Sequence, residues 1–194
     1  MITGGLTPAA CDDPRKLPTR RNDESARGGP YDGSMAVHLV RHARAGERER
    51  SDEPDELRPL TKKGERQARA LVDQFADVTI SRVLSSRYLR CRQTVEPLAE
   101  HVGLPVEEHP ALLETADIEE LWSLIKDLIG APADVVVCTH GNLIGPVIDR
   151  LHRRGVPIDS PDRDCSKGST WTIESGSNGA FARAAYTPPT LLAD

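Results

Sequence analysis

The chain has 194 residues, which suits one α/β domain with a sizeable core and is too short for two ordinary domains with linkers. Hydrophobic residues make up 38% of the chain and charged residues 28%, a globular composition. No stretch approaches the roughly 20 apolar residues of a membrane-spanning helix, and the first residues lack the basic and apolar regions of a signal peptide. We therefore expect a cytoplasmic protein with no membrane partner.

The net charge of −5 argues against a nucleic-acid-binding protein, which would carry a basic excess. Arginine outnumbers lysine twenty to five. Coding bias explains this excess, and so does a need for guanidinium groups that bind phosphate through two hydrogen bonds. The cysteines form no CxxC pair and are expected to be reduced, inert thiols; they are Cys11, Cys91, Cys138 and Cys165.

Residues 1–34 differ in composition from the rest of the chain. They are rich in Gly, Pro and charged residues and show no periodic apolar pattern, which is typical of a disordered extension. Met35 directly precedes the first predicted strand and is a candidate for the genuine initiator. We expect residues 35–194 to form the folded domain.

From Met35 onward, predicted strands alternate with predicted helices. Short apolar runs indicate strands at residues 36–40, 79–85, 106–109, 134–139, 169–174 and 180–186. Apolar residues at three- and four-residue spacing predict helices at 61–75, 88–101, 117–128 and 142–153. The sequence therefore predicts an α/β fold, a three-layer α/β/α sandwich with a mostly parallel sheet.

Two histidines follow predicted strands. His42 comes after the first strand, and His140 comes after the run at 134–139, which is apolar throughout, as in a strand buried on both faces. Ligands of such sheets bind beyond the carboxyl ends of the strands. We therefore expect both imidazoles in the functional site, whereas His38, within the first strand, is expected to be structural.

Cationic groups and a helix start accompany these histidines. Arg41 and Arg44 flank His42, and Arg87 and Arg90 follow the second strand. Gly141 and Asn142 lie where the last helix opens, and the first N–H groups of a helix attract anions. Imidazoles, guanidiniums and a helix N-terminus together predict a site for a phosphoryl group.

Phosphoryl transfer suits these residue types. A neutral imidazole is a good nucleophile toward phosphorus, and a covalent intermediate divides one difficult step into two. Fixed cations stabilise the charge that develops on the transferred group. Glu114, after the third predicted strand, is the best-placed acid for the leaving group, although a solvated loop carboxylate explains it equally well. A metal site would need carboxylates beside the histidines; because these are absent, we expect neither metal nor cofactor.

Four motifs in order resemble those of the histidine phosphatase superfamily, also called the phosphoglycerate mutase-like family. Leu39 to Ala43 (LVRHA) is similar to its RHG signature, and Val137 to Gly141 (VCTHG) is similar to its second-histidine motif. Leu60 to Ala68 (LTKKGERQA) and Ser85 to Thr94 (SSRYLRCRQT) resemble two segments that lie between them. The resemblance spans roughly residues 36–186.

The resemblance implies a role for each matching residue. His42 is implied to be the nucleophile that becomes phosphohistidine, with Arg41 and Arg90 on the phosphoryl group. His140 is implied to be the second histidine, which contacts the phosphate, and Glu114 falls where many members place a proton donor. Arg87 stands where the family usually has Pro, so that it either adds a phosphate contact or covers the rim of the pocket.

The chain resembles the small phosphatases of the family. The phosphoglycerate mutases of this family carry a much longer insertion between the segment that corresponds to the Arg90 motif and the second histidine. The pattern here is similar to SixA-type phosphohistidine phosphatases, and the segment from Ser166 to Trp171 is also similar to the phosphatase half of mycobacterial MutT-type nucleotide hydrolases. The resemblance implies a metal-independent phosphatase that acts on phosphohistidine protein or on a phosphorylated small molecule such as a nucleotide. A mutase and a non-catalytic phosphate-binding module are the alternatives.

Overall fold

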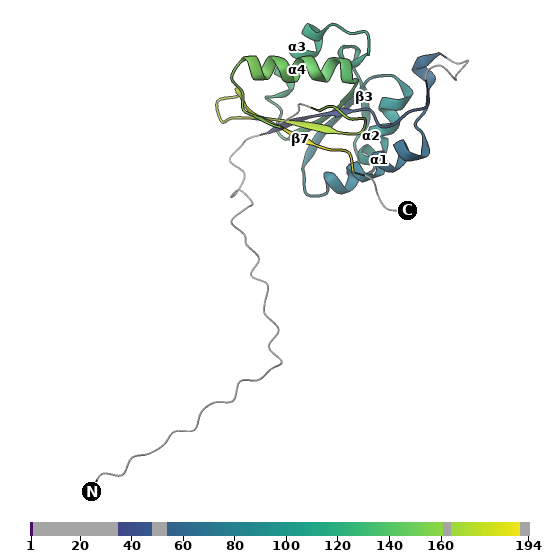
Figure 1. Ribbon diagram of the computed structural model, residues 1–194. Coiled ribbons are helices and arrows are strands. Elements are labelled where there is room, and N and C mark those ends of the chain that lie inside the picture. Colours follow the sequence, from purple (N-terminus) through teal and green to yellow (C-terminus); the bar gives the residue numbers. More distant parts are fainter. Residues whose placement is uncertain (2–34, 48–53, 161–163, 191–194) are drawn as a thin grey trace. The chain divides into compact units, whose positions relative to one another are not determined.

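Seven strands form one sheet in the part of the chain that the structure, a computed structural model, describes: residue 1 and residues 35–47, 54–160 and 164–190. The strands are β1 (Ala36–Arg41), β2 (Ile80–Ser85), β3 (Val106–Glu108), β4 (Asp134–Thr139), β5 (Ile158–Asp159), β6 (Thr170–Ser175) and β7 (Phe181–Thr187). Their order in the sheet is β3-β2-β4-β1-β6-β7-β5 (Figure 1). Because β1 and β4 occupy central positions, the residues that follow them meet in the middle of one edge.

The sheet is mostly parallel, as predicted. β1, β2, β3 and β4 pair in parallel, whereas β6 pairs antiparallel with both β1 and β7. The turn at residues 176–179 joins β6 to β7. The sequence pattern did not indicate the short β5, which pairs with β7, because a two-residue strand carries no periodicity.

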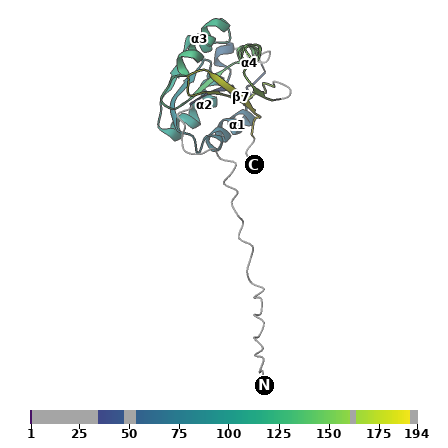
Figure 2. The ribbon, with the colours of Figure 1, turned by 90° about the vertical axis from the view of Figure 1, so that its left-hand side faces the viewer.

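Four α-helices cover the two faces of the sheet. They are α1 (Lys62–Gln74), α2 (Leu89–Val102), α3 (Ile118–Leu128) and α4 (Gly141–Arg153). α1 and α2 lie on one face, and α3 and α4 lie on the other (Figures 1 and 2). The predicted three-layer α/β/α sandwich is therefore confirmed, and each predicted helix end lies within one residue of the observed end. The prediction of disorder for residues 1–34 falls outside the described residues.

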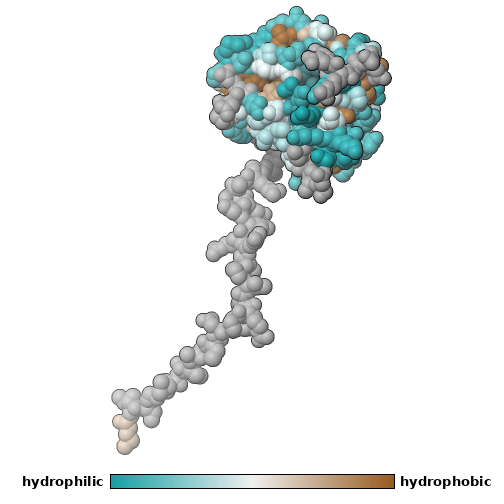
Figure 3. Space-filling view, turned by 45° about the vertical axis from the view of Figure 1, so that its right-hand side comes forward, coloured by the Kyte–Doolittle hydropathy of each residue, from teal (hydrophilic) through white to brown (hydrophobic). Residues whose placement is uncertain are grey.

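Alternation along the central strands explains the two-sided core. Val37 and Leu39 of β1 pack with α3 and α4, whereas Val40 packs with α1 and α2. β4 is buried on both faces from Val135 to Thr139, which matches the apolar run Val135 to Cys138 at its centre. Hydrophobic residues appear only in small groups on the surface that Figure 3 presents. Among the described residues, no helix is long and apolar enough to cross a membrane.

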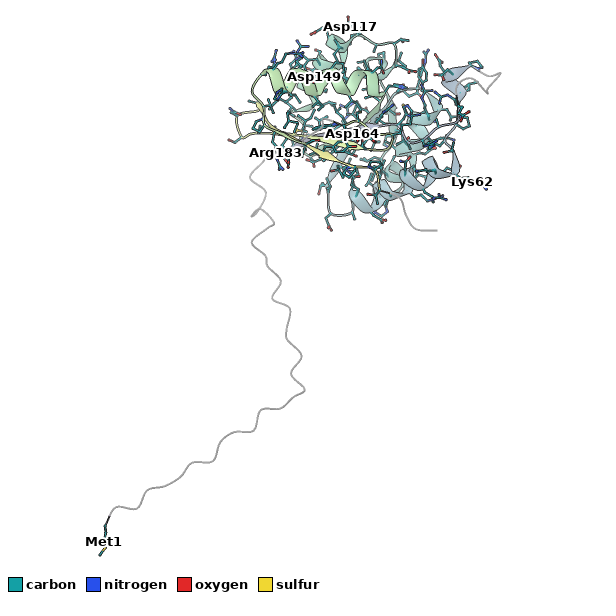
Figure 4. All side chains as sticks on the ribbon, viewed as in Figure 1. Met1, Lys62, Asp117, Asp149, Asp164 and Arg183 are labelled. Atoms are coloured by element: carbon teal, nitrogen blue, oxygen red, sulfur yellow. The ribbon has the colours of Figure 1, made fainter. Side chains whose placement is uncertain are left out.

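Side-chain caps fix where the helices begin. Thr61 accepts a hydrogen bond from the Gly64 N–H at the start of α1, and Asp117 accepts one from the Glu119 N–H at the start of α3. Lys62 and Asp117, which mark these two helix starts, lie on opposite sides of the sheet (Figure 4). α2 ends at Gly103, whose φ of 69° is the left-handed conformation that glycine adopts most easily.

His38 is structural, as predicted. Its Nε2 lies 2.9 Å from Asp134 Oδ2 and its Nδ1 lies 3.0 Å from Thr172 Oγ1, so that both ring nitrogens are engaged between β1 and its two neighbours. Two short 3₁₀ helices, Asp55–Leu57 and Pro110–Leu112, were not predicted, because three residues are too few to show a pattern.

Gly64 permits a close approach between α1 and the segment after β1. A Cβ atom at this position would overlap the backbone carbonyl oxygen of Arg44. That carbonyl accepts hydrogen bonds from the Thr61 N–H at 2.9 Å and from Thr61 Oγ1 at 3.0 Å, so that it cannot move without breaking the helix cap.

We predict that Gly64→Ala lowers the free energy of unfolding by about 1–3 kcal/mol, because the added methyl group forces the backbone apart. Gly130→Ala is the matched control, since no atom lies within 4 Å of a Cβ there, and it should leave stability within about 1 kcal/mol. Urea unfolding of both variants measures the effect. Equal stability of the two variants would contradict the prediction.

Candidate active site

Backbone pairing brings His42 and His140 together. Arg41 is opposite Thr139 in the parallel β1–β4 ladder, and the His42 N–H donates to the Thr139 carbonyl at 3.0 Å. The centroids of the two imidazole rings are consequently 5.4 Å apart. The predicted convergence of the two histidines at the carboxyl edge of the sheet is confirmed.

His42 is held in one tautomer. Its Nδ1 lies 2.9 Å from the Ala43 carbonyl oxygen, which only accepts hydrogen bonds, so that Nδ1 carries the hydrogen and Nε2 carries the lone pair. The backbone at Ala43 is itself held by Thr94, whose Oγ1 accepts a hydrogen bond from the Ala43 N–H at 2.9 Å. The imidazole is thus oriented by the backbone, with Nε2 unprotonated.

Burial keeps this imidazole neutral. Only 6% of His42 is exposed, and this desolvation lowers its pKa from 6.5 to about 3. The Ala43 hydrogen bond opposes that shift, whereas the charges of Arg90, His140 and Arg41 add to it. His42 therefore presents a neutral ring at any pH near 7.

Arg90 places a buried guanidinium beside the histidines. Its side chain is 1% exposed and lies over the ring of Tyr88, with 4.5 Å between the guanidinium carbon and the ring centroid. Nη2 donates to Glu114 Oε2 at 2.7 Å and contacts Asp55 Oδ2 at 3.1 Å, and Nη1 donates to the Asp55 carbonyl at 2.8 Å. Two carboxylates thus offset the cost of burying this charge.

His140 is oriented by contacts on both nitrogens. Nδ1 lies 3.4 Å from Arg90 Nη2 and Nε2 lies 3.1 Å from Ser86 Oγ. Because a guanidinium only donates, Nδ1 accepts and Nε2 bears the hydrogen that points to Ser86. The rings of Tyr88 and His140 meet edge to face at 5.0 Å, which fixes the plane of the imidazole.

Arg41 lies across the first residue of α4. A Cβ atom at Gly141 would lie 2.8 Å from both Nε and Cζ of Arg41, so that only glycine leaves room for the guanidinium. Nη1 of Arg41 donates to the Cys165 carbonyl. The Nε atoms of Arg41 and Arg90 are buried and make no hydrogen bond within the described residues. Two N–H donors in this site therefore remain for an anion.

Glu114 lies one contact away from the histidines, through Arg90. Its backbone carbonyl accepts from Asn142 Nδ2 at 2.8 Å, which ties the loop after the second 3₁₀ helix to the start of α4. Asn142 itself is exposed, and the helix begins one residue earlier than predicted, at Gly141, with His140 at the N-cap. The structure thus brings Glu114 to the site and uses the Asn142 side chain to hold it there.

Arg87 and Arg44 lie at the periphery. The Arg87 side chain is 55% exposed and donates to Glu56 Oε1 at 2.9 Å, whereas the Arg90 side chain is 1% exposed. Arg44 is exposed, and its backbone N–H donates to Gln67 Oε1 at 2.9 Å. A cavity of about 260 Å³ adjoins Arg87; its other lining residues are Glu108, His109, Pro110 and Leu113. Because none of His42, His140 and Arg90 lines this cavity, the role of Arg87 at the rim stays a prediction.

Sequence analysis missed Asp55 and Lys167. Asp55 contacts two arginines, because its Oδ1 accepts from Arg58 Nε at 2.9 Å and its Oδ2 lies 3.1 Å from Arg90 Nη2. It begins a three-residue 3₁₀ helix, which is too short to show a periodic pattern. Lys167 lies in the SKGSTW segment, yet nothing in the local pattern points to the site. Burial and the neighbouring charges of Arg41, Arg58, Arg44 and Arg90 lower the pKa of Lys167, which places it among these cations.

In the described part of the chain, no group of three or more His, Cys, Asp and Glu residues is arranged to hold a metal ion. Three cysteines are described there, and each is a free thiol; they are Cys91, Cys138 and Cys165.

Comparison with known proteins agrees with these motifs. A sequence model of the histidine phosphatase superfamily (branch 1) matches residues 37–121. An 8-oxo-(d)GTP phosphatase of Mycolicibacterium smegmatis is 35% identical over 161 residues, which are 80% of this chain and 49% of that protein. This chain thus spans about half the length of that relative. Phosphohistidine phosphatase SixA of Escherichia coli is 29% identical over 152 residues, 76% of this chain and 91% of SixA.

The fold is shared with a solved structure of SixA. The structure of the protein histidine phosphatase SixA complexed with tungstate superposes with a TM-score of 0.62 and 23% sequence identity. The match covers 81% of this chain and 97% of that chain. The α/β architecture derived above is therefore that of a phosphoglycerate mutase-like protein.

We predict that acid destabilises the protein partly through His42. Its folded-state pKa of about 3 lies below the 6.5 of an unfolded chain, so that between these values the unfolded state binds more protons and stability falls as pH falls. The slope from this one group approaches about 1.4 kcal/mol per pH unit. Urea unfolding from pH 6.5 to pH 4 should show a smaller loss in His42→Gln than in wild type, and equal losses would contradict the assignment.

Proposed function

Because the chain is homologous to the histidine phosphatase superfamily and shares the fold of SixA, we propose that it is a phosphatase that acts through a phosphohistidine on His42. The observation that carries the proposal is the fixed tautomer of His42, whose Nδ1–H donates to the Ala43 carbonyl and whose Nε2 holds the lone pair. A neutral, oriented imidazole surrounded by guanidiniums is a nucleophile for an anionic phosphoryl group.

Binding of the phosphoryl group is assigned to Arg41, Arg90 and His140. The buried Nε–H groups of the two arginines lack protein partners within the described residues and would be satisfied by phosphoryl oxygens. Because Arg90 is fixed by Glu114 and Asp55 before substrate arrives, little reorganisation is needed when charge develops in the transition state. Gly141 contributes by leaving space for Arg41.

The reaction then proceeds in two steps. In the first, His42 Nε2 forms a bond to phosphorus while the bond to the leaving group breaks, and the leaving oxygen or nitrogen takes a proton. We assign this proton to Glu114, the carboxyl group beside Arg90. In the second step, water attacks the phosphohistidine and gives a proton to the Glu114 carboxylate, the bond from phosphorus to Nε2 breaks with its electron pair returning to Nε2, and inorganic phosphate departs. All of these steps use the side chains of this chain, without a metal ion.

Two substrate classes follow from the relatives. SixA is a phosphohistidine phosphatase, which favours a phosphohistidine protein as the substrate. The Mycolicibacterium smegmatis relative is an 8-oxo-(d)GTP phosphatase, which favours a nucleotide, although this chain spans only half of that protein. The shared chemistry is the transfer of a terminal phosphoryl group to His42.

We predict that His42→Ala abolishes turnover and retains the fold. Wild type quenched during the hydrolysis of labelled substrate should yield a phosphoenzyme that is labile in acid and stable in base, whereas the variant should yield none. Both assays contain EDTA, so that they also test whether the reaction proceeds without a divalent ion. Full activity of His42→Ala would contradict the proposal, and loss of wild-type activity in EDTA that one divalent ion restores would indicate a metallophosphatase.

We predict that Arg90→Ala lowers kcat and kcat/KM by about 10²-fold or more, because a preorganised contact to the transferred group is lost. Arg87→Ala, the matched control, should leave kcat within about threefold, since its exposed guanidinium pairs with Glu56. Thermal unfolding of both variants separates loss of the fold from loss of catalysis. If Arg87→Ala loses most of its kcat and Arg90→Ala keeps a kcat near that of wild type, the site assignment is wrong.

A further inference from the structure

The turn that contains Lys167 is hydrogen-bonded to the residues around the nucleophile. The Gly168 N–H donates to the carbonyl oxygens of Arg41 at 3.1 Å and His42 at 3.2 Å, and the Arg41 N–H donates to the Ser169 carbonyl at 3.0 Å. Asp164, at the start of this turn, accepts from Ser166 Oγ at 2.9 Å (Figure 4). Lys167 is therefore carried next to the catalytic segment by backbone contacts.

One buried amide connects this turn to Arg44. Gln67, which is 6% exposed, accepts from the Arg44 N–H at 2.9 Å and donates from Nε2 to the Lys167 carbonyl at 2.8 Å. A Cβ atom at Gly168 would lie 3.0 Å from the Gln67 amide, and the φ of Gly168 is +84°, so that a glycine is needed there for this contact. The backbones of Arg44 and Lys167 are thereby fixed on either side of one side chain.

The two cations differ from the other cations of the site. Arg58 and Arg90 are buried and both contact Asp55. Arg44 and Lys167 are exposed, and neither forms an ion pair with another residue in the described part of the chain. Lys167 is also repelled by the surrounding guanidiniums, as the lowering of its pKa by burial and by these charges indicates. An anion bound between them would relieve this repulsion.

We propose that Lys167 and Arg44 form a second anion subsite, which binds the phosphate adjacent to the transferred one. The substrate class is then an organic diphosphate or triphosphate, whose terminal phosphoryl group is held by Arg41 and Arg90. This inference rests on the proposed function, because the second subsite acts only on a substrate that His42 attacks.

The chemistry of an anhydride fits this arrangement. His42 Nε2 bonds to the terminal phosphorus, the bond from that phosphorus to the bridging oxygen breaks, and the oxygen leaves with the electron pair as part of the shortened phosphate chain. An alkoxide must be protonated as it leaves, whereas a phosphate departs as an anion that cations stabilise. In the proposed subsite, Lys167 and Arg44 would neutralise that anion, and the demand for a proton from Glu114 would be reduced.

The experiment compares ADP with AMP as substrates of the full chain. Lys167→Met and Arg44→Met should each lower the ratio of kcat/KM for ADP over AMP by about tenfold, the value of one charge-assisted contact. Lys126→Met, an exposed lysine in the last turn of α3, is the matched control and should keep the wild-type ratio. Glu114→Gln should reduce hydrolysis of AMP more than hydrolysis of ADP.

Inhibition provides a second readout that does not depend on the leaving group. Pyrophosphate should compete with substrate about tenfold more strongly than inorganic phosphate in wild type, and this advantage should disappear in Lys167→Met. The second subsite alone is overturned if wild type forms the phosphoenzyme and both subsite variants keep the wild-type ratio of kcat/KM for ADP over AMP. A wild type that hydrolyses a phosphohistidine peptide faster than ADP also overturns it. Absence of any phosphoenzyme overturns the proposed function itself.

Discussion

The hydrogen bond from the His42 N–H to the Thr139 carbonyl is the contact on which the site depends. It extends the parallel pairing of two central, fully covered strands by one residue and so fixes the spacing between the two histidines. Because both strands are buried on both faces, a register shift would exchange the side chains that pack into the two cores and disrupt both of them. The hydrophobic effect that orders the sheet therefore also determines the catalytic geometry.

Burial of Arg90 has a cost and a benefit. A guanidinium withdrawn from water is unfavourable unless partners offset the lost hydration, and Glu114, Asp55 and the ring of Tyr88 supply them. Because the protein interior screens charge poorly, the Arg90 guanidinium acts strongly on any anion bound beside His140. The same burial keeps His42 neutral, so that one desolvated pocket holds both a neutral imidazole and a fixed guanidinium.

Most of the fold could be predicted from the sequence because its signals are local. The apolar run within residues 134–139 identified the strand buried on both faces, and the capping residue Thr61 identified the start of α1. The placement of His42 and His140 followed from one topological rule, since the carboxyl ends of parallel strands share an edge. By contrast, β5 and the 3₁₀ helices were missed because they are too short to show a period.

By itself, the sequence thus determined the layers, the strand ends and the two histidines, because each depends on residue patterns within a few turns or strands. Only the tertiary structure decided that Arg87 pairs with Glu56 and that Asp55 contacts both Arg58 and Arg90. It also decided the position of Lys167. These depend on contacts between segments that are far apart in the chain, such as the Gln67 amide that joins Arg44 to Lys167. A loop has no period of its own, and its position is fixed only by the hydrogen bonds and charges that it meets after the sheet has formed.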